Sequence, residues 1–540
     1  MTAIESVTVY GSNAKFQPTP FVTSSVDIYT FEQGLFTFKD NAVLSLKTSK
    51  FIKKPYGEFE IHLAPETLTG NLSWSQIITP MSFVVIGLQR GGIADIPMVG
   101  IVRQVSETQT WTTDSAVRRV VLIRGADLGY FFNITDYYTL WYLAANQKAA
   151  LGITADGLLS GDPGYIGSTW YNKIMAGKGV YANTYFPYKG SQITFPAAFG
   201  QRFDLYDVII PYGDYFLGGN ESWYEKFMQV FPFPFYEFFV TTMANGVYEN
   251  TTGGTAFSAT GLSSTRTATP VVVARLNPVP QLVASTVSNV PNFIGIDSSA
   301  WQGLPAFDLQ GSSPVISNAM FNESEVHNFY TINPLWLSGQ NGQSNSNLAQ
   351  FIFNYAVVVD DASINRYGYR PMMGNISWFA DVAGGFAQSG KVNLTQVMST
   401  ILARFCGYYE ATPLMATAGV QTWLRPDIQI GCKFSYAPFK DGALWDFYIE
   451  GVEHTYTFGG PSKTVLSLTR GLPKTVYAAN QANGLLFNIH QGNAQRINGA
   501  YQSGLPAGSA AYLHALAPTQ FATWQGQLNH IYITPQAVGP

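Results

Sequence analysis

The sequence predicts a mainly β protein with α insertions, in which two similar β modules flank a mixed α/β region and an extended arm follows at the C-terminus. Three observations lead to this prediction. Runs of alternating apolar and polar residues recur with glycine or proline between them, as in the half-buried strands of barrels and sandwiches. Residues 57–125 and 423–471 share a layout of strands that closes on Arg-Gly. Residues 475–540 contain no Asp or Glu and a single Arg, unlike the rest of the chain.

The first β module is expected at residues 51–132, after an N-terminal segment at residues 1–50. Phe59, Ile61 and Leu63 alternate with polar neighbours, which is the period of a strand with one buried face. Several short strands at this spacing indicate a small barrel or sandwich. The other strands are expected at three apolar runs, each bounded by polar residues or glycine: Phe83–Leu88, Met98–Val105 and Val117–Ile123.

The middle of the chain is less regular. Residues 133–269 are expected to be a mixed helical and loop insertion, with a helix at Tyr138–Leu151 and a solvated Thr/Ser/Gly loop at Asn250–Arg266. Residues 270–392 are expected to form a β-rich middle domain. Residues 393–472 then combine a helix with the second β module.

The helix of that last block is predicted at Leu394–Tyr408, because apolar residues recur there at helical spacing behind the N-cap candidate Asn393. The second module ends in a hairpin, Phe447–Gly471. Its alternation changes phase at Gly451, which predicts a β-bulge. Gly459-Gly460-Pro461 then ends the first strand of the hairpin.

Residues 473–540 are predicted to be an extended arm. A segment with so few charges and so little contiguous apolar sequence does not readily build a core of its own, so it is either disordered or laid on a partner. We favour the arm, because spaced large side chains can anchor it to a partner. These anchors include Leu485, Leu486, Phe487, Tyr501, Phe521, Trp524, Ile531, Tyr532 and Ile533.

Composition favours a protein whose surface is covered by neighbours. Charged residues make up 12% of the chain, about half of the ~25% that is usual. Aromatic residues reach 15%, and interface cores are poor in charge and rich in aromatic side chains. The alternative is a large β protein with many exposed tyrosines. The net charge of −4 excludes a strongly basic footprint for nucleic acid.

Targeting and redox signals are absent from the sequence. Cys406 and Cys432 are too few for a disulfide framework, and Cys432 is expected to be a small core residue. The N-terminus has no basic start followed by an apolar run. The most apolar window, Val230–Met243, contains two prolines and Glu237. We therefore expect no membrane-spanning segment.

The sequence offers no convincing catalytic constellation. Glu221, Glu225 and Glu237 are the best candidates for the two carboxylates of a glycosidase, but a structural role is expected for Glu237. Cys406 has no obvious base beside it. The six histidines show no metal-ligand spacing: His62, His327, His454, His490, His514 and His530. We expect no enzyme, no catalytic residue, no bound metal and no cofactor.

Several segments, taken in order, resemble the baseplate hub proteins of long-tailed bacteriophages, of the late-control and Mu-like type. The best match is Asp361–Arg370 (DASINRYGYR), which is similar to the Ser-Ile-x-x-Tyr-Gly-x-Arg of that family. The hairpin with His454 and its Thr-Arg-Gly close resembles the last hairpin of the family. The other matching segments are Trp74–Pro80 with Phe83–Leu88, Gly100–Val105, Arg119–Asp127, Phe231–Phe239, Pro270–Pro278 and Ser324–Ile332.

The resemblance implies that both β modules are tail-tube-like barrels and that the protein is a structural part of the virion. Three copies would form a ring that joins the tail tube to the central spike or tip and passes DNA at ejection without binding it specifically. Its partners would be further copies of itself, the tail tube protein, the spike and other baseplate proteins, assembled in the host cytoplasm. Two alternatives stay open: a tail-associated peptidoglycan hydrolase and a glycan-binding tail-tip protein.

Overall fold

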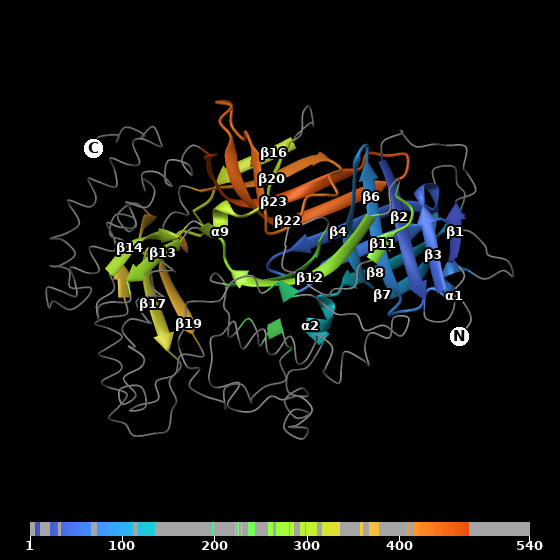
Figure 1. Cartoon of the computed structure of the whole chain (residues 1–540), viewed down its shortest axis with the longest axis horizontal. Helices are drawn as coiled ribbons and strands as arrows, with labels where there is room; N and C mark the ends of the chain where they lie inside the picture. The colour runs from blue at the N-terminus through green and yellow to red at the C-terminus, as the bar shows by residue number, and fades with distance from the viewer. Residues whose placement is uncertain are drawn as a thin grey trace, which may run out of the picture.

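The protein is described here by a computed structural model. It describes residues 6–10, 22–30, 34–65, 73–111, 117–134, 197–198, 222, 224–225, 228, 236–243, 257–262, 266–279, 281–285, 292–297, 299–309, 316–323, 325–334, 357–359, 367–376, 408–409 and 415–474. Most of these residues lie in β-strands, and the strand pairs are mostly antiparallel (Figure 1).

One sheet of 14 strands organises the molecule. Its path begins with β1 (Ser6–Tyr10), β3 (Gly34–Lys39), β2 (Val22–Thr30), β6 (Phe83–Arg90), β7 (Ile93–Trp111), β8 (Val117–Asp127), β5 (Glu58–Leu63) and β4 (Val43–Phe51). It continues with β22 (Trp445–Thr457), β23 (Lys463–Pro473), β20 (Ala416–Trp423) and β16 (Ile316–Phe321). Beside this path, β21 (Lys433–Tyr436) pairs with β22, and β15 (Ala306–Asp308) pairs with β21.

The predicted strands of both modules are confirmed, and so is the bulge at Gly451. Phe59, Ile61 and Leu63 all point into a core from β5. The pairing of β22 with β23 shifts register between Ile449 and Gly451. Gly459 has a positive φ of 67°, which suits the turn that separates the two strands.

Two separate closed barrels are not confirmed. Within the described residues the strand path has two ends, β1 and β16, so the sheet is not closed. The physical reason lies in β4, which pairs with β5 along one edge and with β22 along the other. The first module therefore continues directly into the second. The expected boundary between residues 50 and 51 falls inside β4.

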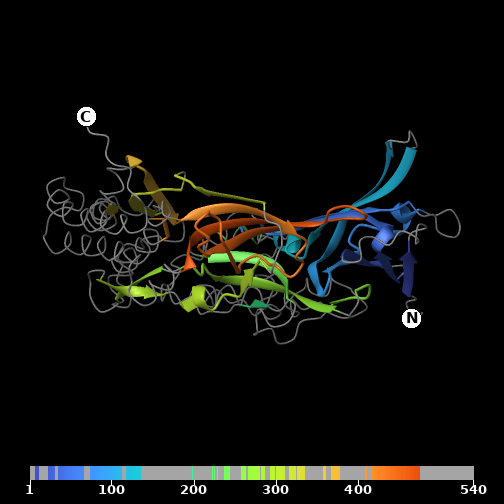
Figure 2. The same ribbon diagram turned by 90° about the horizontal axis from the view of Figure 1, so that it is seen from above.

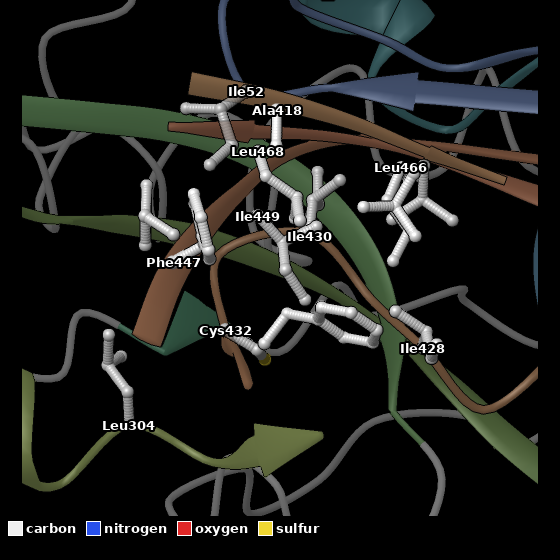
Figure 3. Packing of buried hydrophobic residues seen from close by; sticks show 14 of the residues in the cluster. Ile52, Leu304, Ala418, Ile428, Ile430, Cys432, Phe447, Ile449, Leu466 and Leu468 are labelled. Atoms are coloured by element: carbon white, nitrogen blue, oxygen red, sulfur yellow. The ribbon is translucent and has the colours of Figure 1, made fainter. Parts of the chain in front are cut away.

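Two hydrophobic clusters lie on the inner side of this sheet, one in each module. The first cluster contains Val26, Ile28, Phe36, Phe38, Leu46, Ile61, Trp74 and Ile123 among others. The second contains Ile52, Leu304, Ala418, Ile428, Ile430, Cys432, Phe447, Ile449, Leu466 and Leu468, which Figure 3 shows packed together. Cys432 is fully buried there, as expected of a small core residue.

A helix cap that is visible in the sequence positions Trp74 in the first core. Helix α1 (Trp74–Ile77) begins with a capping box, in which the backbone N–H of Ser73 donates to Gln76 Oε1 at 3.0 Å. This cap sets the helix so that Trp74 enters the core edge-on to Phe36 and Phe38, with ring centroids 5.4 and 4.7 Å away. Edge-to-face packing of this kind favours one arrangement of large rings.

A smaller sheet covers part of the main sheet. It contains β10 (Tyr236–Met243), β12 (Arg266–Leu276), β11 (Phe257–Ala259) and β9 (Ala197–Ala198), and its strands lie beneath the main sheet in Figure 2. Phe239 and Val273 of this sheet belong to the second core. The expected boundary between residues 269 and 270 falls inside β12.

The predicted loop at Asn250–Arg266 is wrong at residues 257–262. Ala259 and Leu262 are buried, and β11 pairs with β12. The buried carboxylate of Asp27 accepts hydrogen bonds from the N–H and the hydroxyl of Thr260, at 3.0 and 3.1 Å. A tract of small polar residues is expected to be solvated, but here the carboxylate of Asp27 on β2 accepts the hydrogen bonds of Thr260.

The remaining elements are short. Strands β13 (Gln281–Ser285) and β14 (Asn292–Asp297) form a two-stranded sheet. In a separate sheet of three strands, β17 (Phe329–Pro334) lies between β18 (Val357–Val359) and β19 (Pro371–Ile376). The helical elements are η1 (Asp40–Ala42), α1, α2 (Tyr130–Ile134) and α9 (Ser299–Gln302).

Three sequence predictions concern residues outside the described ranges. These are the helix at Tyr138–Leu151, all but the last residue of the helix at Leu394–Tyr408, and the arm from residue 475 onward. Among the described residues, no helix has the length and apolar character that a membrane crossing requires.

Candidate functional site: the polar face of the main sheet

The side of the main sheet that points away from the two cores forms one polar surface across both modules. Strand residues alternate between the two sides of a sheet, and the register keeps this alternation in phase from strand to strand. We call this surface the polar face. It consists of Thr417, Gly419, Gln421, Lys463, Val465, Ser467, Glu453, Thr455, Thr457, Lys47, Ser49, Glu58, Glu60, His62, Leu122 and Arg124, none of which is buried.

The pairing register sets part of the polar face in a straight row. Lys463 is opposite Thr455, which is opposite Lys47 in turn. Lys47 is opposite Glu60, and Glu60 is opposite Arg124. Neighbouring strands are about 5 Å apart, so these side chains lie within reach of one another across the sheet.

Lys47, Arg124 and Lys463 on the polar face each bond a side chain of the same chain, the first two a carboxylate and the third an amide. Lys47 Nζ lies 2.9 Å from Glu453 Oε2, and Arg124 Nε donates to Glu60 Oε2 at 2.8 Å. Lys463 Nζ donates to Gln421 Oε1 at 3.3 Å. The hydrogen bond from His62, followed by the one from Arg124, lowers the pKa of Glu60. The carboxylate therefore stays charged, and this part of the face carries both signs in close pairs.

A groove of about 780 Å³ opens on the polar face where the β5–β8 pair meets β7. Its charged lining residues are Lys47, Glu58, Glu60, Arg103 and Arg124, and its walls include Pro80, Met81 and Tyr130. Arg103 belongs to a bulge in β7, where the pairing with β8 shifts between Val102 and Gln104. The groove therefore combines charged side chains with an aromatic wall.

A repeated backbone device underlies both modules. Gly125 of β8 lies beneath the ring of Phe59 on β5, and Gly471 of β23 lies beneath the ring of Phe447 on β22. A Cβ atom at either position would come within 2.1 Å of that ring. The Arg-Gly pairs noted in the sequence thus share a reason: the glycine leaves room for an aromatic ring. The sequence shows both glycines, but it does not show which ring covers each of them.

The two arginines of these pairs differ. Arg124 is exposed on the polar face. Arg470 is buried, has a positive φ of 56° and stacks on the ring of Tyr408 at 3.7 Å. It also donates to the carbonyl oxygen of Tyr408 at 2.7 Å. Arg470 therefore holds β23 to a segment outside the main sheet, which spacing in the sequence does not reveal.

Of the three carboxylates considered as catalytic candidates, the structure describes Glu225 and Glu237, and each of them accepts a hydrogen bond from its own chain. Glu225 accepts a hydrogen bond from the N–H of Ser222 at 2.9 Å, and Ser222 Oγ accepts one from the N–H of Glu225, as in a capping box. Glu237 is buried and accepts the hydroxyl of Tyr448 at 2.7 Å, which ties β10 to β22. Glu221 lies outside the described residues.

The three described histidines have different partners. His62 contacts Glu60 on the polar face, and His327 lies edge-on to Tyr409. Buried His454 shares a hydrogen bond of 2.9 Å with Thr464 Oγ1. In the described part of the chain, no group of three His, Cys, Asp or Glu side chains is placed to hold a metal ion. His490, His514, His530 and Cys406 lie outside that part.

Two of the segments that carry the family resemblance are joined by one buried side chain. Asn328 donates from Nδ2 to the carbonyl oxygen of Gly368 at 2.7 Å and accepts the N–H of Arg370 at 2.8 Å. Gly368 has a φ of +77°, as its turn in DASINRYGYR suggests. Strands β17 and β19 then run parallel from this junction.

A buried ion pair lies beneath β4, and no pattern in the sequence indicates it. Lys50 Nζ is 3.7 Å from Asp127 Oδ2, and Asp127 also accepts the N–H groups of Gly57 and Gly129 at 2.8 and 2.9 Å. Burial raises the pKa of Asp127 to about 6, and burial likewise lowers the pKa of Lys50. The pair joins β4 to the end of β8 where the two modules meet.

Comparison with known proteins gives loose matches to phage tail proteins. No protein-family model and no curated protein matches the sequence. Among solved structures, the tail protein from Neisseria meningitidis MC58 is 11% identical over 83% of this chain and 96% of its own, with a TM-score of 0.40. The 43 kDa tail protein of prophage MuSo2 from Shewanella oneidensis is 10% identical over 83% and 98%, with a TM-score of 0.40.

A third similar structure is the prophage tail protein gp18 from Listeria monocytogenes EGD-e, 10% identical over 84% of this chain and 96% of its own, with a TM-score of 0.33. The overlap extends along most of the chain but is loose in detail. These three structures are tail proteins, and at this level of superposition no family assignment follows for this chain.

Proposed function

We propose that this chain is the baseplate hub, or tail hub, of a long-tailed bacteriophage. Three copies form a ring that joins the tail tube to the central spike or tip and passes DNA during ejection. Its partners are further copies of itself, the tail tube protein, the spike and other baseplate proteins, and it acts in the virion after assembly in the host cytoplasm. The observation that carries this proposal is the polar face, which crosses both modules without interruption.

The presence of two similar modules in one chain supports a role as a connector between a six-fold tube and a three-fold spike. Each module presents an antiparallel sheet with a glycine beneath a phenylalanine ring, one at Phe59 and Gly125 and the other at Phe447 and Gly471. Two similar modules in one chain give a three-fold ring six similar surfaces around its axis. Such a ring can meet a six-fold tube on one side and a three-fold spike on the other.

The chemistry of the polar face suits the wall of a DNA channel. A protein holds duplex DNA by releasing counterions from phosphates that its free Lys and Arg side chains contact. On the polar face, Lys47 and Arg124 are already paired with Glu453 and Glu60, and Arg103 lies in a groove that also contains Glu58 and Glu60. We therefore assign the polar face to the lumen, where paired charges and hydroxyl groups let the polyanion pass.

The alternative as a peptidoglycan hydrolase has less support. Glu225 accepts a hydrogen bond in a helix cap, and buried Glu237 accepts one from the hydroxyl of Tyr448. In the described part of the chain, neither carboxylate lines the groove on the polar face, whereas glycoside hydrolysis requires two carboxylates that flank a cleft. A zymogram on bacterial cell walls would reveal hydrolase activity, and glycan binding by the purified monomer would favour a tail-tip lectin.

Imaging and mass measurement test the proposal directly. We expect the purified protein, alone or with its spike partner, to have the mass of a trimer. Negative-stain electron microscopy should show a three-fold ring with a central hole. A mass that stays that of a monomer even in the presence of the spike protein would contradict the hub assignment.

A further inference from the structure

The groove on the polar face contains one cation that is held in place without an ionic partner. Arg103 is exposed, and its guanidinium lies 4.3 Å from the ring centre of Tyr130 and 5.9 Å from that of Tyr56. These two rings contact each other edge-on at 5.4 Å. Stacking of this kind orients the planar guanidinium and leaves its N–H donors free for a ligand. Within the described residues Arg103 makes no ion pair.

The rim beside Arg103 is fixed as well. Met81 has a positive φ of 71°, which is rare for a residue with a side chain. Its N–H donates to the carbonyl oxygen of Val102 at 2.7 Å, next to Arg103 in the chain. The rim of the groove is thus bonded to the strand that carries the free cation. Non-glycine residues held in this conformation cluster at binding sites.

The other charges of the groove select between ligands. Lys47 and Arg124 are engaged with Glu453 and Glu60. Glu58 is exposed and, among the described residues, has no ionic partner. It lies on β5, two strands from Arg103 on β7, which corresponds to about 10 Å. The groove therefore offers one free positive group and one free negative group on opposite sides.

We propose that this groove binds an extended polypeptide segment of a partner protein, with an acidic side chain on Arg103 and a basic side chain near Glu58. In an extended segment, residues two apart point to the same side and are about 7 Å apart, so two long side chains reach both groups. A phosphate backbone fits poorly, because its uniform negative charge would meet Glu58 and Glu60. This assignment does not depend on the ring or on its symmetry.

Synthetic peptides test the proposal on the full-length protein. The probes are two acetylated, amidated pentapeptides of Ser and Thr that carry Glu and Lys two residues apart, one in each order. A third peptide has Gln at both positions. Isothermal titration should detect at least one charged peptide and not the neutral one. The Arg103→Gln and Glu58→Gln variants should each bind it about 10-fold more weakly, the loss of one charge-assisted hydrogen bond.

Arg119→Gln is the matched control, because Arg119 is also an exposed arginine and pairs with Glu107 outside the groove. Its peptide affinity should stay within about two-fold of the parent protein, as for a distant surface change. Three results would overturn the proposal: no binding of either charged peptide, equal losses in the Arg119 and Arg103 variants, or displacement of the peptide by a short DNA duplex. The three variants change exposed side chains, so their folding is expected to be unaffected.

Discussion

At Gly125 and Gly471 a phenylalanine ring on the neighbouring strand leaves no room for a methyl group. A Cβ atom at Gly125 would lie 2.1 Å from Phe59 Cζ and 2.2 Å from the carbonyl oxygen of Ile101. One of these contacts is to backbone, so a flexible side chain cannot relieve both. We therefore expect Gly125→Ala and Gly471→Ala each to lower the free energy of unfolding by about 1–3 kcal/mol, as overpacking in a core does.

Gly419 provides the matched control for this prediction. It lies in β20 on the polar face, and a Cβ atom there would have nothing within 4 Å. Gly419→Ala should therefore change the free energy of unfolding by less than about 0.5 kcal/mol, which is usual for surface positions. Urea denaturation of the three variants measures the difference. If the losses at Gly125 and Gly471 are as small as the change at Gly419, the aromatic rings can move aside and the prediction is wrong.

The free energy of unfolding should depend on pH through His454. Burial, as the largest cause, lowers the pKa of its ring to about 4; nearby Asp427 opposes the shift and Lys50 adds to it. A folded-state pKa below the ordinary value of about 6.5 favours the neutral ring. Below pH 6.5 the unfolded chain takes up a proton at His454 more readily than the folded protein does. The free energy of unfolding therefore falls by about 3 kcal/mol as the pH drops from 6.5 towards 4. Asp127, with its pKa raised to about 6, acts in the opposite direction over the same range.

The effect of His454 is therefore read as a difference between two proteins. In His454→Gln the group that resists protonation is removed, while Asp127 titrates as before. The variant should be the less stable protein at pH 7, and its deficit should shrink by about 3 kcal/mol between pH 7 and pH 4. Urea denaturation of both proteins across this range measures the shift. If the deficit does not change with pH, the pKa of His454 is the same in the folded and the unfolded protein, and the prediction is wrong.

Among the elements, the strands of the polar face make the sharpest functional prediction. Duplex DNA should not bind measurably at physiological salt, because Lys47 and Arg124 are paired with Glu453 and Glu60, and Arg103 shares its groove with Glu58 and Glu60. The double variant Glu453→Gln with Glu60→Gln frees both cations. We expect it to bind a 20-base-pair duplex, with a logarithmic salt dependence steeper by about 0.9 for each phosphate contacted.

Fluorescence anisotropy at two salt concentrations measures this change. Glu323→Gln is the control, because it frees Arg370 away from the polar face and should leave DNA binding undetectable. If the parent protein already binds DNA with micromolar, salt-sensitive affinity, the polar face is not the wall of a passive channel.

For the whole molecule, the arm at residues 473–540 stays a prediction. Truncation at Val476 should leave the two modules folded, because the described core ends with Leu472. Assembly with other subunits should weaken, since the spaced aromatic residues of the arm are expected to anchor on a neighbour. Thermal denaturation and light scattering separate the two effects. If the truncated chain fails to fold, the arm belongs to the core of its own chain.

The sequence by itself determined the local elements. Alternation at Phe59, Ile61 and Leu63 located β5, and the phase change at Gly451 located the bulge in β22, because burial on one side of a strand leaves a period of two. The Arg-Gly pairs indicated the duplication before any contact was known. The carboxylates that it offered for catalysis are engaged elsewhere, Glu225 in a cap and Glu237 with Tyr448.

Only the tertiary structure decided how these elements combine. The pairing of β4 with β22 made one open sheet where the sequence suggested separate barrels, because a strand can pair along both edges and its sequence does not say with which partner. The same holds for Asp27, whose hydrogen bonds turned part of a polar tract into covered structure. The polar face and the groove at Arg103 likewise depend on the register between distant strands. Period and turn chemistry are local and can be read along the chain, whereas register across the sheet is set by long-range packing.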